Sequence, residues 1–101
     1  MFVVLWEFEV KPGSEQCFET VYGPDGDWVR LFRSDENYQG TRLLRDASRD
    51  GIYVTADFWS SREAYERFRE AAAESYAAID AECEGLTISE RKIGSFQSTS
   101  S

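Results

Sequence analysis

The side chains best suited to chemistry gather at one junction, DFWSSREAYERF (residues 57–68), where an apolar run meets a helical pattern. Trp59 ends the run, Thr55 precedes it by four residues and Tyr65 follows it by six. Indole N–H and phenol O–H groups can donate hydrogen bonds to an anionic oxygen, while their rings form an apolar wall. Such groups suit the binding of a planar aromatic ring that carries an anionic oxygen, such as a phenolate. The alternative is that Trp59 only ends a core strand.

The chain contains no histidine. This removes the usual general base at neutral pH, the Ser-His-Asp and Cys-His nucleophile systems, HExxH zinc sites and a histidine ligand for haem. The two cysteines, Cys17 and Cys83, show no metal-ligand spacing, and neither a P-loop nor a GxGxxG pattern is present. We therefore expect no metal and no cofactor, and chemistry that depends on acids, arginines, aromatic hydroxyls or the substrate itself.

Asp57 shares a strand face with Thr55 and Trp59, because side chains alternate along a strand. If buried, it would have a raised pKa and could act as a base; if paired with an arginine, it would be structural. We expect the surface or salt-bridged state for Asp57. A phenolate would also need a cation, and Arg42, Arg45 and Arg91 are the candidates if they point inward.

The formal net charge of -8 argues against nucleic acid or an anionic membrane as a partner. No apolar run approaches the roughly 20 residues that cross a bilayer, and the first residues lack the pattern of a signal peptide. We expect a cytoplasmic protein.

Hydrophobic periodicity predicts the order β-α-β-β-α-β with one small extra helix. This is the ferredoxin-like α+β pattern, with a four-stranded antiparallel sheet in a single domain over residues 1–96 and a disordered polar tail over 97–101. The predicted strands cover residues 2–10, 38–46, 52–60 and 86–93, and the predicted helices cover 15–22, 28–34 and 62–84.

Ser60 and Glu63 match the capping box that starts the last helix. Within this helix, apolar positions recur every three or four residues and predict one buried stripe. Ala72, between Phe68 and Tyr76, either lets the helix approach the sheet or leaves room for a ligand. We expect Trp6, Phe68, Ala72 and Tyr76 to bind a substrate, the alternative being that these side chains are ordinary core.

Both faces of the first and third strands carry apolar side chains, yet two helices can cover only one face of a sheet. In the third strand, Ile52, Val54, Ala56 and Phe58 form the face opposite Thr55, Asp57 and Trp59. The second subunit of a homodimer is the natural cover for the other face.

Four segments, VVLWEFEVKPGSE, GTRLLRD, DFWSSREAYERF and LTISERKIGSF, together resemble the antibiotic biosynthesis monooxygenase family of dimeric α+β barrels. The W-x-S motif at Trp59 is the most specific of these elements. Quinone-forming members carry an Asn four residues before this Trp and a Tyr six after it, so the resemblance aligns Trp59 and Tyr65 with functional positions and puts Thr55 at the Asn position. Haem-degrading members use an Asn where this chain has Trp6, and a His.

The resemblance implies a cofactor-independent monooxygenase that oxidises an aromatic or polyketide-like hydroquinone with O2. Trp59, Tyr65 and Thr55 are then the candidate catalytic residues, and the expected partners are a small aromatic ligand and a second copy of the chain. A non-catalytic dimeric module that binds a small ligand or another protein on the same scaffold is the alternative.

Overall fold

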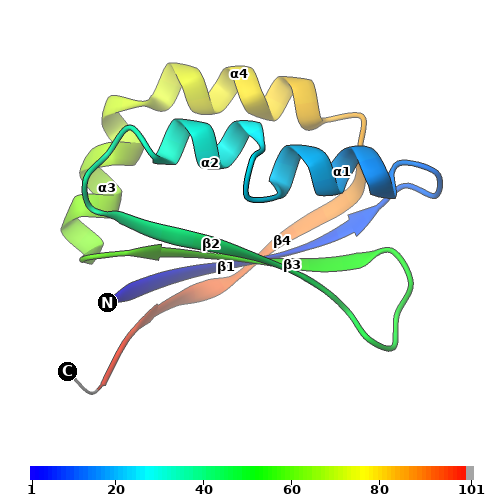
Figure 1. Cartoon of the computed structure of the whole chain (residues 1–101), viewed down its shortest axis with the longest axis horizontal. Coiled ribbons are helices and arrows are strands. Elements are labelled where there is room, and N and C mark those ends of the chain that lie inside the picture. Colours follow the sequence, from blue (N-terminus) through cyan, green and yellow to red (C-terminus); the bar gives the residue numbers. More distant parts are fainter. Residues whose placement is uncertain (100–101) are drawn as a thin grey trace.

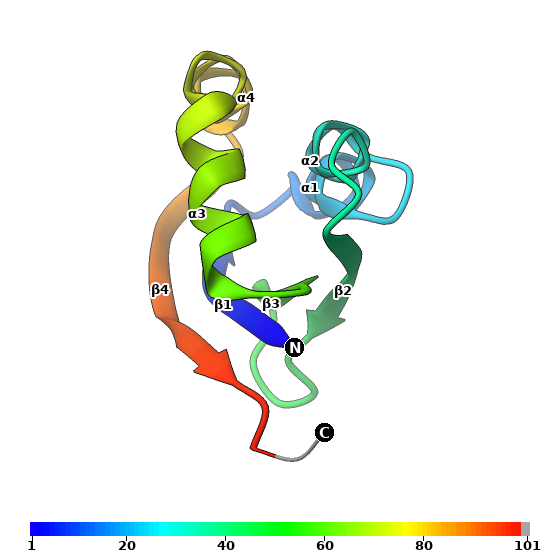
Figure 2. The same ribbon diagram turned by 90° about the vertical axis from the view of Figure 1, so that its left-hand side faces the viewer.

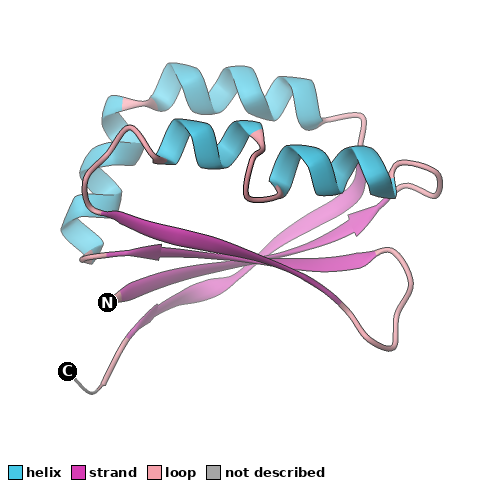
Figure 3. Ribbon diagram, in the orientation of Figure 1, coloured by secondary structure: helices cyan, strands magenta, loops and turns pink. Residues whose placement is uncertain are grey.

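A computed structural model describes residues 1–99 of the chain. The four strands form one antiparallel sheet in the spatial order β2-β3-β1-β4, and the helices lie on one side of it (Figures 1 and 3). This confirms the ferredoxin-like order and the four-stranded sheet. The elements in chain order are β1 (Phe2–Val10), α1 (Glu15–Tyr22), α2 (Asp27–Phe32), β2 (Tyr38–Arg45), β3 (Ile52–Trp59), α3 (Arg62–Ala71), α4 (Ala73–Cys83) and β4 (Thr87–Gln97).

The long helix predicted over residues 62–84 is two helices, because the backbone of Ala72 leaves the helical region at φ -101° and ψ 19°. Helix α3 rises from the end of the sheet where β3 ends, and α4 then runs above the sheet beside α1 and α2 (Figures 1 and 2). The break therefore turns the second half of the stripe over the sheet, where Tyr76 faces the same interior as Tyr65.

The helix starts one residue later than the capping box predicted. Ser61 is the N-cap, and its hydroxyl accepts the Ala64 N–H at 3.1 Å. Ser60 is bound instead to the loop before β2, since its N–H donates to the Asn37 carbonyl at 2.9 Å and its hydroxyl contacts Asn37 Oδ1 at 2.8 Å. The assignment of Ser60 as the cap was wrong because this loop, distant in sequence, competes for its hydroxyl.

Strand register decides which side chains face the helices. Trp6 on β1 lies opposite Thr55 on β3, and Asp57 on β3 lies opposite Thr41 on β2. These residues share the covered face with Trp59, whose partner on β1 is Phe2. The polar and aromatic face of β3 is therefore the one beneath the helices.

The opposite face of the sheet has no helix over it (Figure 2). Phe58, Val3 and Phe96 are neighbours across three strands of this face, and Phe96 remains 48% exposed. Leu44, which is 52% exposed, faces the same way from β2. The apolar second face predicted from the sequence is thus present in the single chain.

Strand β4 includes Gln97, and the Ser98 N–H donates to the Met1 carbonyl at 2.9 Å. The tail expected over 97–101 thus begins with a strand residue, and its last two residues lie outside the described part of the chain. Within the described residues, no helix is both long and apolar enough to cross a membrane.

Candidate functional site

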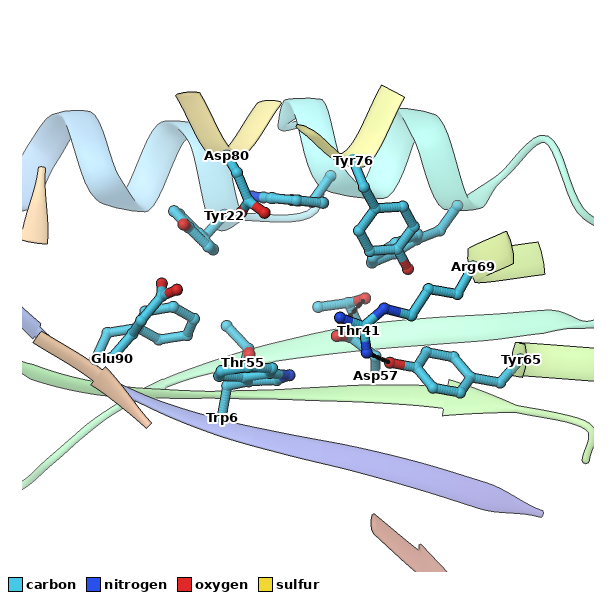
Figure 4. A pocket seen from close by; sticks show the side chains of 13 residues that line it. Trp6, Tyr22, Thr41, Thr55, Asp57, Tyr65, Arg69, Tyr76, Asp80 and Glu90 are labelled. Carbon is cyan, nitrogen blue, oxygen red and sulfur yellow. Dashed lines mark hydrogen bonds between the residues drawn. The ribbon is translucent and has the colours of Figure 1, made fainter. Parts of the chain in front are cut away.

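A cavity of about 110 Å³ lies between the covered face of the sheet and the helices (Figure 4). Its volume is somewhat below the ~150 Å³ of an engineered cavity that admits benzene, so the enclosed part accommodates at most one aromatic ring. One open groove shares Tyr65 and Arg69 with the cavity, and another shares Tyr22, Asp80 and Glu90 with it. A ligand larger than one ring would extend from the cavity into one of these grooves.

Asp57 lies on the floor of the cavity. Its Oδ1 accepts the Thr41 hydroxyl at 2.7 Å, and the Thr41 hydroxyl in turn contacts the Tyr38 hydroxyl at 2.5 Å. Among the described residues Asp57 forms no ion pair. Burial raises the pKa of its carboxyl to about 6, although the Thr41 hydrogen bond opposes the rise.

The expectation of a surface or salt-bridged Asp57 was therefore wrong. Arg42, Arg45 and Arg91, the candidate cations for a phenolate, do not line the cavity. Register places Arg42 and Arg91 on the uncovered face, where Arg91 pairs with Glu7 at 3.4 Å. Asp57 is instead covered by helices, and no basic side chain of these helices lies within ion-pair distance of it. Ionisation of its carboxyl therefore costs free energy.

The cation of the site is Arg69, which the sequence reasoning missed. It extends from α3 between Tyr65 and Tyr76 (Figure 4). Its Nη1 donates to the Tyr65 hydroxyl at 3.4 Å, and its guanidinium carbon lies 5.7 Å from the centre of the Tyr76 ring. The spacing of four residues between Tyr65 and Arg69 places both on one helix face and is the sequence signal that could have found it.

Three tyrosines of the lining remain protonated near neutral pH. Burial raises the pKa of the Tyr65 hydroxyl, while the charge of Arg69 opposes that rise. Burial also raises the pKa values of Tyr22 and Tyr76 well above the usual range of a phenol. Each of these groups is therefore available as a hydrogen-bond donor.

Aromatic rings supply most of the remaining wall. Trp6 lies on the floor beside Thr55, and its ring is seen edge-on in Figure 4, so one face is turned towards the helices. Phe8, Trp28 and Phe32 complete the apolar lining. A flat ring could stack on Trp6 while its oxygen reaches the end of the cavity near Asp57.

The other end of the cavity is acidic. Asp80 on α4 and Glu90 on β4 lie across from each other there (Figure 4). Partial burial raises the pKa of both carboxyls, and the charge of Asp80 further raises that of Glu90. Sequence reasoning missed both residues, because they come from elements that only the tertiary structure brings together.

Four of the expected site residues, Thr55, Tyr65, Trp6 and Tyr76, line the cavity. Trp59, Phe68 and Ala72 belong to the packing behind it. Trp59 is 0% exposed, and its ring packs against Tyr65 and Phe68 at centroid distances of 5.6 and 5.2 Å. Trp59 thus supports the ring of Tyr65 from behind.

A family model described as antibiotic biosynthesis monooxygenase matches residues 1–78. The chain belongs to this family. The resemblance read from the motifs is confirmed, and no curated protein sequence matches the chain.

Solved structures with this fold include relatives of both known and unassigned function. A variant of SnoaB, a cofactor-independent oxygenase from Streptomyces nogalater, is similar with a TM-score of 0.74 and 19% identity over 99% of this chain and 94% of that one. A putative antibiotic biosynthesis monooxygenase from Caulobacter crescentus CB15 is similar with a TM-score of 0.79 and 15% identity over 98% and 90%. Rv0793 from Mycobacterium tuberculosis is similar with a TM-score of 0.68 and 17% identity over 98% of both chains. At these identities the similarity shows the fold.

Proposed function

We propose that this member of the antibiotic biosynthesis monooxygenase family is a cofactor-independent monooxygenase that oxidises an electron-rich aromatic hydroquinone with O2. The observation that supports the proposal is that two groups line the same end of an aromatic cavity. One is the buried Asp57 carboxyl, with a pKa of about 6, and the other is the Arg69 guanidinium, which is bound to the Tyr65 hydroxyl. The description of SnoaB as a cofactor-independent oxygenase supports the same reaction class.

In this mechanism Asp57 is the general base that removes the phenolic proton. A phenol ionises with a pKa of about 10, so transfer to a carboxylate near pKa 6 is uphill by about 4 units, or about 5 kcal/mol. A hydrogen bond to a charged group contributes about 1.5–3 kcal/mol, so Arg69 and Tyr65 together offset about 3–6 kcal/mol of this cost. The site can therefore hold a phenolate only if these donors face its oxygen.

The deprotonated ring then supplies the electrons. Transfer of one electron to O2 and recombination of the two radicals forms a carbon–oxygen bond at a ring carbon that bears hydrogen. Loss of that hydrogen and cleavage of the O–O bond release one oxygen atom as water. A hydroquinone and O2 thus give a hydroxyquinone and water, so that all four electrons needed by O2 come from the substrate. The aromatic walls exclude bulk water from this intermediate.

The other expected site residues have supporting roles in the proposal. Thr55 and Trp6 contact the ring of the substrate from the floor. Trp59 and Phe68 hold Tyr65 in place from behind, and Ala72 is the point where the chain turns so that α4 covers the cavity.

We further propose that the protein is a homodimer in which the uncovered sheet face of one chain packs against that of another. The apolar row of Phe58, Val3 and Phe96 supports this arrangement, because exposed apolar area of this kind favours association.

Oxygen consumption tests the catalytic proposal. With a panel of hydroquinones of one to three rings, the wild-type protein is expected to consume one O2 per hydroxyquinone formed, in buffer treated with chelator. Tyr65→Phe should lower kcat/KM by about tenfold or more through the loss of one donor, with an unchanged melting temperature. The matched control is Tyr53→Phe, which removes a hydroxyl that contacts Glu19 outside the cavity.

The small volume of the cavity keeps one alternative in view, a dimeric module that binds an aromatic ligand without converting it. Binding of the same hydroquinones with no O2 uptake above the uncatalysed rate, across the whole panel, would favour this alternative and reject the monooxygenase.

A further inference from the structure

The hydroxyl of Tyr76 has no hydrogen-bond partner among the described residues, although the atom is fully buried. The hydroxyls of Tyr38, Tyr53 and Tyr65 each contact a protein group, namely Thr41, Glu19 and Arg69. An unpaired buried hydroxyl costs free energy and is uncommon in folded proteins. The buried indole N–H groups of Trp28 and Trp59 are unpaired as well, so Tyr76 is one of three such donors among the described residues. The Tyr76 side chain lines the cavity, where a bound ligand would supply the partner that the protein itself does not.

The surroundings of Tyr76 show where this partner would lie. Its ring is held at the start of α4 by Trp28 and Phe32, at centroid distances of 5.3 and 5.9 Å. Its hydroxyl points from the helix layer down towards Arg69 and the sheet floor that carries Asp57 (Figure 4). The unpaired O–H thus points towards the polar end of the cavity, although its oxygen is not reached by solvent in this structure.

We propose that Tyr76 is a catalytic residue whose O–H donates to the phenolate oxygen of the bound aromatic substrate, as a third donor beside Arg69 and Tyr65. The inference rests on the proposed function for the identity of the substrate as a phenol. The hydrogen-bond partner proposed for the unpaired Tyr76 hydroxyl is thus an anionic oxygen on a planar ring.

The energetics of ionisation support a third donor. A phenol and the Asp57 carboxyl differ by about 4 pKa units, which is a factor of about ten thousand in the proton-transfer equilibrium. Each donor to a charged oxygen offsets a factor of about ten to one hundred, so two donors can fall short of this factor. The pKa of Tyr76 itself is raised by burial, so its hydroxyl keeps the proton that it donates.

The three donors also come from both helices of the broken pair. Tyr65 and Arg69 lie on α3, and Tyr76 lies on α4 beyond the turn at Ala72. A continuous helix would carry the later residues along the axis of α3 and away from this point. The break at Ala72 is therefore what directs the Tyr76 hydroxyl towards the same place as the other two donors.

Binding of para-nitrophenol tests the proposal directly, since this single-ring phenol changes its absorption spectrum when it ionises. In the wild-type protein, the bound phenol should ionise at lower pH than the free phenol. Tyr76→Phe should weaken binding of the phenolate by about tenfold or more. It should also raise the pH at which the bound phenol ionises by about one unit. Tyr53→Phe should change neither quantity.

Nitrobenzene, which has the same ring without the hydroxyl, separates a direct contact from a packing effect. Its affinity should be the same for the wild-type protein and Tyr76→Phe, because Phe keeps the ring contacts with Trp28 and Phe32. Equal loss of both ligands would mean that Tyr76 only shapes the cavity, and the proposal would be wrong. Unchanged para-nitrophenol binding in Tyr76→Phe would overturn it as well, as would the absence of binding by the wild-type protein.

These outcomes are independent of the monooxygenase proposal. If the protein binds and ionises para-nitrophenol through Tyr76 but consumes no O2 with any hydroquinone, the role of Tyr76 as a donor is confirmed and the monooxygenase proposal is rejected. If Tyr76→Phe converts hydroquinones as well as the wild-type protein does, the monooxygenase proposal stands and the role of Tyr76 as a donor is rejected.

Discussion

Replacement of Asp57 by Asn should make the protein more stable and less active. The change keeps the size of the side chain and an oxygen that can accept the Thr41 hydroxyl, but it removes the buried charge. If Asp57 is the general base, its loss should lower kcat/KM by about 100-fold to 10,000-fold. A gain in stability with a loss of activity is the expected signature of a charged group that is retained for function.

The size of the stability gain follows from the pKa of Asp57. Folding raises this pKa from 3.8 to about 6. The folded state therefore binds the proton more tightly, so the contribution of Asp57 to stability is most favourable below about pH 4 and falls as pH rises through about 6. The difference of about 2 pKa units corresponds to at most about 3 kcal/mol at neutral pH.

Urea unfolding, followed by tryptophan fluorescence, measures this difference. At about pH 7.5, Asp57→Asn should unfold with a free energy higher by about 1–3 kcal/mol than the wild type, and the two proteins should converge as pH falls to about 4. Equal stabilities at about pH 7.5, or a difference that does not depend on pH, would refute the claim that Asp57 carries a buried, unpaired charge.

Asp46→Asn is a matched control with the opposite sign. The backbone amide of Ser48 and the side chain of Arg49 lower the pKa of the exposed Asp46 carboxyl. Its contribution to stability is present above its unfolded pKa and is lost as pH falls through the lower folded pKa. Asp46→Asn should therefore be slightly less stable than the wild type at neutral pH and indistinguishable from it in acid.

Three further changes test other parts of the site. Arg69→Gln should lower kcat/KM by about tenfold or more in the O2 assay because it removes the cation from the phenolate; Arg67→Gln, on the same helix but outside the cavity lining, should not. Trp59→Phe should lower the free energy of unfolding by about 1–3 kcal/mol in urea, since it empties volume in the core, and an unchanged stability would place Trp59 outside the core. Phe96→Asp should convert the proposed dimer to a monomer in sedimentation velocity, and a wild-type monomer at micromolar concentration would reject the dimer.

Local patterns in the sequence, namely strand alternation and helical spacing, predicted much of the fold. Alternation along β3 put Thr55, Asp57 and Trp59 on one face, and the three-to-four spacing of the last helical segment put Tyr65 and Tyr76 on one stripe. Both groupings are correct in the structure. Such patterns are readable because each depends only on neighbours within a few residues along the chain.

The errors in the site have one common cause. Asp57 was expected at the surface or in a salt bridge and Ser60 at the helix cap, and neither residue type contradicts those places. Contacts with segments distant in sequence decide the environments of both residues. The helices cover Asp57, and the loop that contains Asn37 binds Ser60. Burial and pKa depend on such contacts, which periodicity does not report.

The sequence by itself determined the order of strands and helices along the chain, the side chains that share each face, and the absence of histidine chemistry. Only the tertiary structure decided that Trp59 packs behind the cavity while Tyr65 and Tyr76 line it, and that Arg69 rather than a strand arginine is the cation. The physical reason is that residue order sets a side chain's direction relative to its own element. The packing of elements sets what that side chain meets, and the turn at Ala72 brings Tyr76 over Asp57.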